Sequence, residues 1–284
     1  MRLHQPRTAL ETLERFLAEP GISEAVASRH LLPAREAVFA PVPEWLDQRL
    51  VQAIERRGIS ALYSHQREAL DALHAGEDVV IVTPTASGKS LCYNLPVLQE
   101  IGEDPAARAL YLFPTKALRQ DQLAEFRDLS ELAGMELSAA VYDGDTPTPI
   151  RAMVREAGQV VVTNPDMLST AVLPHHTKWF QLFEQLRYIV IDEAHTYRGI
   201  FGSHVANVLR RLLRICAHYG STPRIVCSSA TVGNPGELAQ TLTGRPFRVI
   251  DRSGAPQGER HVVVLDPPPL DVRTGVRPGP HGLA

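Results

Sequence analysis

From Ile59 onward, short apolar runs alternate with longer stretches in which apolar residues recur at helical spacing. The short runs are typical of strands buried on both faces of a sheet, and the longer stretches are typical of amphipathic helices. Their alternation predicts an α/β fold, a mostly parallel sheet flanked by helices. The expected strands are 79–82, 109–113, 137–142, 160–163, 188–191, 225–228 and 247–250. The expected helices are 65–75, 90–101, 117–133, 148–157, 204–218 and 235–242.

The residues before this alternation show only helical spacing. Leu10, Leu13 and Leu17 share one side of a helix that Pro20-Gly21 would end, and a second helix is expected over 44–57. We therefore expect residues 1–57 to form a small helical accessory segment packed on the main domain, which would span 58–250.

Composition changes again in residues 251–284. Residues 253–258 are loop-like, 261–265 can form a last strand, and a Pro/Gly-rich tail without periodicity begins at Pro267. Such a composition is typical of a linker, so we expect the tail to lead to a part that this chain lacks.

The overall composition is that of an ordinary globular chain. Of its 284 residues 44% are hydrophobic and 21% charged, and the net charge of −3 provides no general attraction for nucleic acid. The three cysteines lack metal-ligand spacing, which favours reduced core thiols and a cytoplasmic protein. No apolar run is long enough to cross a membrane, so no membrane partner is expected.

The first expected strand leads into a small-residue loop and then a helix start. The loop and helix start consist of Thr83, Pro84, Thr85, Ala86, Ser87, Gly88, Lys89 and Ser90. Strand, loop and helix N-terminus in this order predict a phosphate-binding loop, because backbone N–H groups and the helix dipole favour anions. Lys89 would reach the β- and γ-phosphates of ATP, and the Ser90 hydroxyl would hold Mg²⁺. The usual pattern has glycine where this chain has Thr83.

Two later strands end in polar residues. The strand over 188–191 ends in Asp192-Glu193, where Asp192 can hold Mg²⁺ and Glu193 can polarise the attacking water. The strand over 225–228 ends in Ser229-Ala230-Thr231, whose hydroxyls could hydrogen-bond the acidic pair or His195 and sense the nucleotide. An ordinary helix cap and an ordinary strand-to-turn boundary are the alternatives for these two segments.

In their order along the chain, these three segments resemble motifs I, II and III of superfamily 2 helicases of the DEAD/DEAH-box type. The surrounding phrases are similar to those of MrfA/YprA-type bacterial DNA helicases, relatives of the Hrq and Lhr branches. These phrases are Leu62-Tyr-Ser-His-Gln66, Phe113-Pro-Thr-Lys-Ala-Leu118, Tyr142-Asp-Gly-Asp-Thr-Pro147, Thr163-Asn-Pro-Asp-Met-Leu168 and Tyr197-Arg-Gly-Ile-Phe-Gly-Ser-His204. The resemblance implies a RecA-like P-loop NTPase domain.

The resemblance also implies roles for individual residues. Gln66 would read the adenine edge, and His195 would couple the ATP site to the segment at Ser229. Contacts to the backbone of one nucleic-acid strand are implied for Thr115, Lys116, Arg119, Gly144, Thr163 and Asn164. The implied partner is single-stranded DNA or a 3′-tailed duplex, although nothing in these residues excludes RNA. The basic run at Arg210-Arg211 and Arg214 is open to interpretation as a solvated face or as a DNA patch.

The implied function is the N-terminal ATP-binding lobe of an ATP-dependent DNA helicase with a role in DNA repair. Such motors use a second RecA-like domain that supplies arginine fingers, and we find no such domain in this sequence. We therefore expect a fragment or a truncated product that hydrolyses ATP slowly and cannot unwind a duplex. The alternatives are a non-catalytic module that binds ATP or nucleic acid, an RNA helicase lobe, and an unrelated P-loop ATPase such as a transporter subunit.

Overall fold

A computed structural model describes residues 8–267, which divide into two compact units. The larger unit comprises residues 37–255, and the smaller unit joins the chain up to Glu36 with the chain from Pro256 onward. The strands of the larger unit are β2 (Phe39–Ala40), β3 (Leu62–Tyr63), β4 (Val79–Val82), β5 (Arg108–Leu112), β6 (Ala139–Val141), β7 (Val160–Thr163), β8 (Leu186–Ile191), β9 (Arg224–Ser229) and β10 (Arg248–Ile250).

The helices of the larger unit lie between these strands. They are α3 (Gln48–Arg56), α4 (Ser64–His74), α5 (Lys89–Glu103), α6 (Lys116–Leu132), α7 (Thr148–Ala157), α8 (Pro165–Met167), η1 (Leu168–Val172), η2 (Leu173–Trp179), α9 (Phe180–Glu184), η3 (Ala194–Thr196), α10 (Gly199–His218) and α11 (Pro235–Thr243). The seven predicted strands and six predicted helices are confirmed, with ends that differ by a few residues.

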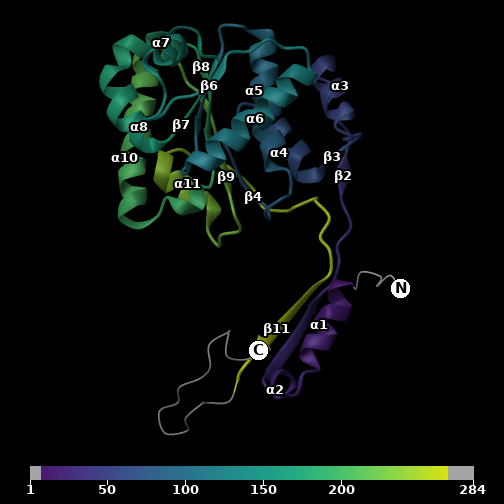
Figure 1. The fold of residues 1–284 in the computed structure, drawn as a ribbon. Coiled ribbons are helices and arrows are strands. Elements are labelled where there is room, and N and C mark those ends of the chain that lie inside the picture. Colours follow the sequence, from purple (N-terminus) through teal and green to yellow (C-terminus); the bar gives the residue numbers. More distant parts are fainter. Residues whose placement is uncertain (1–7, 268–284) are drawn as a thin grey trace. The chain divides into compact units, whose positions relative to one another are not determined.

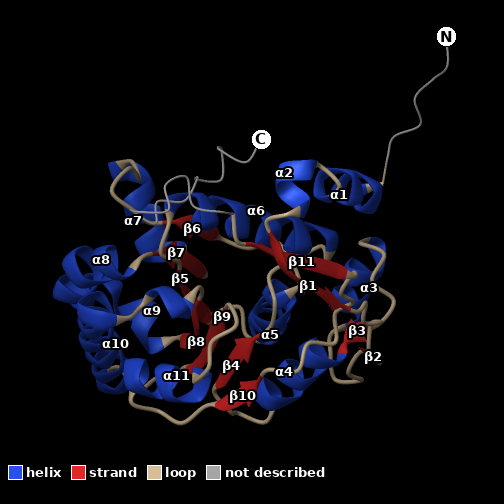
Figure 2. Cartoon of the chain, turned by 90° about the horizontal axis from the view of Figure 1, so that it is seen from below, coloured by secondary structure: helices blue, strands red, loops and turns tan. Residues whose placement is uncertain are grey.

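A seven-stranded sheet forms the centre of the larger unit (Figure 1). Its order is β10-β4-β9-β8-β5-β7-β6, and every neighbouring pair is parallel. Figure 2 shows helices on both sides of this row of strands. The predicted α/β fold, a mostly parallel sheet flanked by helices, is confirmed.

The two faces of the sheet carry two hydrophobic cores, because successive strand residues point to opposite faces. On β4, Val79 and Ile81 pack with residues of α3, α4, α5 and α6, whereas Val80 and Val82 pack with residues of α7, α9, α10 and α11. All four side chains are buried. This burial on both faces explains why the strand sequences are continuously apolar.

The sheet order brings together the three strand ends on which the predicted ATP site depends. β9 lies between β4 and β8, with Val82 opposite Ser229 and Ile191 opposite Cys227. Since parallel strands end at the same edge of a sheet, the segments that follow β4, β8 and β9 meet there.

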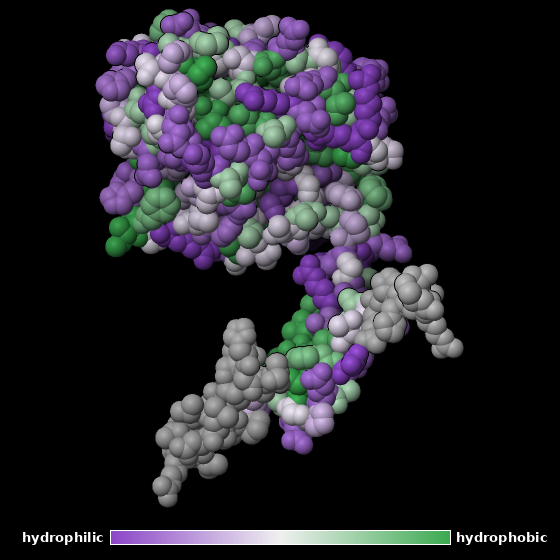
Figure 3. Space-filling model, viewed as in Figure 1, coloured by the Kyte–Doolittle hydropathy of each residue, from purple (hydrophilic) through white to green (hydrophobic). Residues whose placement is uncertain are grey.

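The smaller unit contains α1 (Ala9–Leu17), α2 (Pro20–Ser23), β1 (Val26–Leu32) and β11 (Arg260–Leu265). The two strands pair antiparallel, and Leu17 and Ile22 of the helices are buried. Arg29 of β1 forms an ion pair of 3.3 Å with Glu14 of α1. Figure 3 shows apolar surface on this unit, in agreement with the exposure of Leu32 and other β1 and β11 side chains.

The expected helical segment over 1–57 is wrong in two respects. Residues 26–32 form a strand, because their hydrogen-bonding partner is β11, far along the chain. In addition, α3 belongs to the larger unit, where Leu50 and Ile54 are part of the main core. The last predicted strand, 261–265, is confirmed as β11. The expected tail lies outside the described residues from position 268 onward.

The sequence did not predict the irregular helical stretch between β7 and β8. Residues 165–184 form short α, π and 3-10 segments, with a non-helical backbone at His175. Such short turns are too brief to give a clear apolar period.

Candidate nucleotide and strand-binding site

The loop between β4 and α5 has the backbone shape of an anion site. Ala86 and Gly88 adopt left-handed conformations with φ of 62° and 77°, and no side chain caps the N-terminus of α5. Alanine at a positive φ is strained, and such strain is retained where the surrounding structure requires it. The uncapped first turn leaves backbone N–H groups of α5 available to a phosphate.

The Lys89 ammonium points into this loop. Its Nζ donates to the backbone carbonyls of Thr83 (2.8 Å) and Pro84 (3.1 Å). Burial lowers the pKa of Lys89, while the charges of Asp192 and Glu193 oppose that shift. A phosphate oxygen would offer this half-buried cation a charged partner in place of two neutral carbonyls.

Thr83 contributes to the loop through its side chain. Its hydroxyl lies 2.6 Å from the hydroxyl of Ser87, and both residues are buried. This hydrogen bond joins the two ends of the loop across its base. The departure from the usual glycine therefore has a structural explanation in this chain.

The side-chain amide of Gln66 is engaged at both ends. Its oxygen accepts from the Tyr63 backbone N–H (2.9 Å) and its nitrogen donates to the Gly88 carbonyl (2.9 Å). The side chain is buried. In this conformation Gln66 supports the phosphate loop, and its second N–H and second oxygen lone pair are not used by these two bonds.

Ser90 lies in the first turn of α5, on the side of the helix that packs against α6. Its hydroxyl donates to the Glu125 carboxylate across 2.6 Å. A hydroxyl has one proton and two lone pairs, so this bond leaves its lone pairs available to a cation. Glu125 was not among the residues that the sequence singled out.

Asp192 is buried at the end of β8. Its carboxylate accepts a hydrogen bond from the hydroxyl of Ser228 on β9. Burial raises the pKa of Asp192, and the hydrogen bonds from Ser228 and the Glu193 backbone and the charge of Lys89 oppose this rise. A buried carboxylate that is costly to ionise would be stabilised by a metal cation beside it.

His195 lies between Glu193 and the segment after β9. Its Nδ1 is 3.2 Å from the backbone N–H of Ala230 and 3.1 Å from a carboxylate oxygen of Glu193. An unprotonated Nδ1 accepts from Ala230, whereas a protonated Nδ1 donates to Glu193. The two contacts therefore exclude each other, and the ring links the two segments only when its Nδ1 accepts from Ala230.

The sequence predicted that the hydroxyls of Ser229 and Thr231 could contact the acidic pair, but the hydroxyl that does so belongs to the preceding residue, Ser228. Ser228, which no sequence motif singled out, donates to Asp192, whereas the Ser229 hydroxyl donates to the neighbouring Ala230 carbonyl (2.9 Å). Thr231 is exposed. Only the register of β9 against β8 shows that residue 228 lies beside Asp192, and the sequence does not give this register.

Two of the predicted strand contacts are accessible at the start of α6. Thr115 caps this helix through its hydroxyl, and Lys116 is exposed and forms an ion pair with Asp145. The hydrogen bond with Lys116 lowers the pKa of Asp145. A phosphate at Lys116 would compete with this carboxylate.

Arg119 and Thr163 are buried, so their side chains do not reach a strand on the surface. Arg119 pairs with Asp143 at 3.6 Å, and its buried Nε has no hydrogen-bond partner among the described residues. The Thr163 hydroxyl donates to the Tyr142 carbonyl across 2.6 Å. Both residues hold the loops in place instead of presenting a contact surface.

Asn164 and Gly144 lie at the same edge of the sheet, after β7 and β6. The Asn164 side chain accepts from the Met167 N–H (2.8 Å) as the cap of α8. Gly144 is exposed and has open space around its Cα. Its carbonyl accepts from Arg151 (3.1 Å), so the backbone of this turn is fixed.

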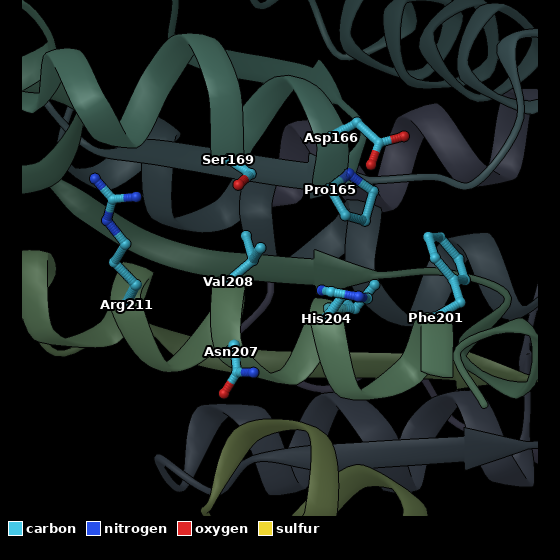
Figure 4. A pocket seen from close by; sticks show the side chains of 9 residues that line it. Pro165, Asp166, Ser169, Phe201, His204, Asn207, Val208 and Arg211 are labelled. Atoms are coloured by element: carbon cyan, nitrogen blue, oxygen red, sulfur yellow. The ribbon is translucent and has the colours of Figure 1, made fainter. Parts of the chain in front are cut away.

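A groove of about 410 Å³ lies between α8, η1 and α10 (Figure 4). Arg211 lies at one end, and Phe201 and Asp166 lie at the other. No hydrogen bond or ion pair within residues 8–267 engages the side chains of Asp166, Ser169, His204, Asn207 and Arg211. The groove thus offers unpartnered polar groups next to Asn164, beside an exposed aromatic ring.

Within the part of the chain that the structure describes, no cluster of three or more His, Cys, Asp or Glu side chains could hold a metal, and no helix is long and apolar enough to cross a membrane. A magnesium ion that keeps several waters needs few protein ligands. Ser90 and Asp192, which follow strands that end at the same edge of the sheet, carry oxygens of the kind that such an ion binds.

Comparison with known proteins gives a consistent result. The sequence profile described as DEAD/DEAH box helicase matches residues 63–238. The chain is 54% identical to the uncharacterised ATP-dependent helicase YprA of Bacillus subtilis over 93% of this chain and 36% of YprA. It is 41% identical to the ATP-dependent helicase HRQ1 of Saccharomyces cerevisiae over 84% of this chain and 22% of HRQ1.

A solved structure with a similar fold is that of the DUF1998 helicase MrfA bound to DNA and AMPPNP. It aligns with a TM-score of 0.89 at 51% identity, over 96% of this chain and 37% of MrfA. The chain thus spans about a third or less of the length of these relatives.

Proposed function

Because this chain belongs to the DEAD/DEAH box helicase family, we propose that it is the ATP-binding lobe of an ATP-dependent DNA helicase. The observation that carries the proposal is the meeting of the segments after β4, β9 and β8 at one edge of the sheet. This edge combines an uncapped helix N-terminus, the Lys89 ammonium and a buried carboxylate at Asp192.

In this proposal the larger unit, residues 37–255, binds ATP with Mg²⁺. The residues of the loop from Thr83 to Ser90 surround the phosphates, Lys89 neutralises their charge, and Ser90 and Asp192 hold the cation. Bound Mg²⁺ supplies charge neutralisation on the phosphate oxygens. Glu193, whose carboxylate is partly exposed and contacts His195, orients and polarises the attacking water.

The proposed partner is one strand of DNA. Exposed Lys116, the Gly144 turn and the α8 cap at Asn164 line the edge that follows β5, β6 and β7. The groove beside Arg211 extends this surface. Structures of MrfA contain DNA, and RNA stays an alternative because backbone contacts carry no base identity. A 3′-tailed duplex and a role in DNA repair rest on the family resemblance alone, and a cytoplasmic location rests on the spacing of the three cysteines.

The relatives are about three times as long as this chain, so we propose that a second RecA-like lobe lies in the part that the chain does not span. A second lobe contributes arginine side chains to the transition state, and these can be worth about 10³–10⁵ in rate. The 284-residue chain is then expected to bind ATP and single-stranded DNA but not to separate a duplex.

A strand-separation assay with the 284-residue chain tests the proposal that this lobe binds ATP and DNA but needs a second lobe to separate a duplex. A 3′-tailed DNA duplex with a fluorophore and quencher at its end is mixed with the chain, ATP and Mg²⁺. We expect nucleotide binding and no strand separation. ATP-dependent separation by this chain would contradict the two-lobe proposal, and tighter binding to an RNA than to a DNA oligonucleotide of equal length would contradict the DNA assignment.

A further inference from the structure

The Ser90 hydroxyl is held by a side chain from a different helix. Ser90 lies in the first turn of α5, and its Oγ donates to a carboxylate oxygen of Glu125 on α6 across 2.6 Å. A second hydrogen bond, from the Tyr93 hydroxyl to the Gln122 side chain (2.8 Å), joins the same two helices one turn further on. The relation between Ser90 and Glu125 is therefore part of a well-defined packing contact.

Glu125 is itself fixed by Arg57, the residue that follows α3 as its C-cap. One Arg57 nitrogen lies 3.9 Å from the Glu125 carboxylate, and another donates to the Glu125 backbone carbonyl at 3.0 Å. Arg57 also contacts Asp128, one turn along α6. The carboxylate that accepts the Ser90 hydrogen bond is thus held in place by contacts to a second helix end.

The direction of this hydrogen bond matters for a cation. A serine hydroxyl carries one proton and two lone pairs, and the bond to Glu125 uses the proton. The lone pairs are then turned away from α6 and are available to a metal ion. Without an acceptor at position 125 the hydroxyl can rotate and donate elsewhere, so part of its orientation would be lost.

We propose that Glu125 is a positioning residue that orients Ser90 for the Mg²⁺ of the nucleotide site. This inference rests on the proposed function, because it assumes that Ser90 is a magnesium ligand. Glu125 does not touch the nucleotide or the cation. It acts through Ser90, and it places the cation site in contact with α6, the helix that begins at Thr115 and Lys116.

The test is a magnesium titration of nucleotide binding, followed by fluorescence of a labelled ATP on the 284-residue chain. Loss of a hydrogen-bond partner behind a metal ligand typically costs about 10- to 100-fold in metal affinity. For Glu125→Ala we expect the Mg²⁺ concentration at half-saturation to rise by that factor, with unchanged affinity for the nucleotide in EDTA. Glu125→Gln keeps an oxygen acceptor and should stay close to the wild-type midpoint.

Two further variants separate the possible explanations. Asp128→Ala removes the other acidic partner of Arg57 but leaves the Ser90 contact, so it should titrate like the wild type. Ser90→Ala should shift the midpoint at least as much as Glu125→Ala. If Glu125→Ala titrates like the wild type while Ser90→Ala shifts, the positioning role is refuted and the proposed function stands. If Ser90→Ala also fails to shift, the magnesium assignment of the proposed function fails.

Discussion

The side-chain nitrogen of Gln66 lies 2.9 Å from the backbone carbonyl of Gly88, the residue at which the phosphate loop meets α5. A Cβ on Gly88 would come within 2.6 Å of the same nitrogen, so the two residues are packed as closely as glycine allows. The glutamine that the family resemblance assigns to adenine thus also supports the loop that would hold the phosphates.

Replacement of Gln66 by alanine should destabilise the nucleotide-free chain. The change leaves the partly buried Tyr63 N–H and Gly88 carbonyl without their partner, and an unpaired group that is fully buried costs about 1–3 kcal/mol, which is the upper bound here. Denaturant unfolding measures the loss. Gln52→Ala, at an exposed glutamine of α3, serves as the control and should change stability by less than about 0.5 kcal/mol. Equal stabilities of the two variants would contradict the supporting role.

The ion pair between Lys116 and Asp145 should limit strand binding. Asp145→Asn releases Lys116 for a phosphate, so affinity for a single-stranded oligonucleotide should increase at low salt. Lys116→Ala should weaken binding and reduce the slope of log affinity against log salt by about 1. Fluorescence anisotropy at several salt concentrations measures both effects, with Lys178→Ala as the control. An Asp145→Asn variant that binds more weakly than the wild type would argue against this competition.

The groove beside α10 predicts a difference between two arginines of one helix. Arg211 lines the groove, whereas Arg214 is exposed outside it. Arg211→Ala should lower the affinity for the oligonucleotide and should reduce the slope of log affinity against log salt by about 1. Arg214→Ala should leave the affinity and the slope close to those of the wild type. The same anisotropy titration decides between a strand-binding patch and a solvated face. Equal effects of the two variants would support the solvated face.

Asp192 predicts a pH dependence of stability. Its pKa is raised by burial, so the folded state binds its proton more tightly than the unfolded state. The stability that it contributes is present below the ordinary carboxyl pKa and is lost as pH rises through the folded-state value. The Asp192→Asn variant does not show this loss of stability, because an asparagine side chain does not ionise.

Without nucleotide or Mg²⁺, the unfolding free energy of the wild type should therefore fall relative to that of Asp192→Asn as the pH rises from about 4 to neutrality. Thermal unfolding across this range measures the difference. If the unfolding free energy of the wild type instead rises relative to that of the variant as the pH rises, the attraction of Lys89 stabilises the Asp192 carboxylate more than burial destabilises it, and no metal is needed.

The seven strands of the main sheet and the six longer helices between them were predictable because each pattern is dictated locally. A run such as Val79–Val82 must be buried on both faces, and the loop after it carries its own turn chemistry. That the three polar strand ends meet was expected from a parallel sheet together with the family resemblance, because order along the chain does not by itself determine the order of strands in a sheet. The edge of the sheet at which we propose the nucleotide site is the one that the sequence indicated.

Side-chain partners were not predictable to the same degree, because they depend on register and helix packing. Ser228 contacts Asp192 through the register of β9, and Glu125 reaches Ser90 only because α6 packs on α5. A charged residue such as Arg119 after a strand suggested a phosphate contact, yet it is buried against Asp143. β1 was missed because its partner, β11, is distant in the sequence.

The most direct test of the central claim is the affinity of the 284-residue chain for ATP with Mg²⁺, measured by calorimetry for the wild type and Lys89→Ala. Loss of a charged hydrogen bond to phosphate is worth about 1.5–3 kcal/mol, or roughly 10- to 100-fold in affinity. We expect the wild type to bind, Lys89→Ala to bind more weakly by that factor, and Lys178→Ala to match the wild type. Failure of the wild type to bind ATP, or equal binding by Lys89→Ala, would contradict a nucleotide site at this edge of the sheet.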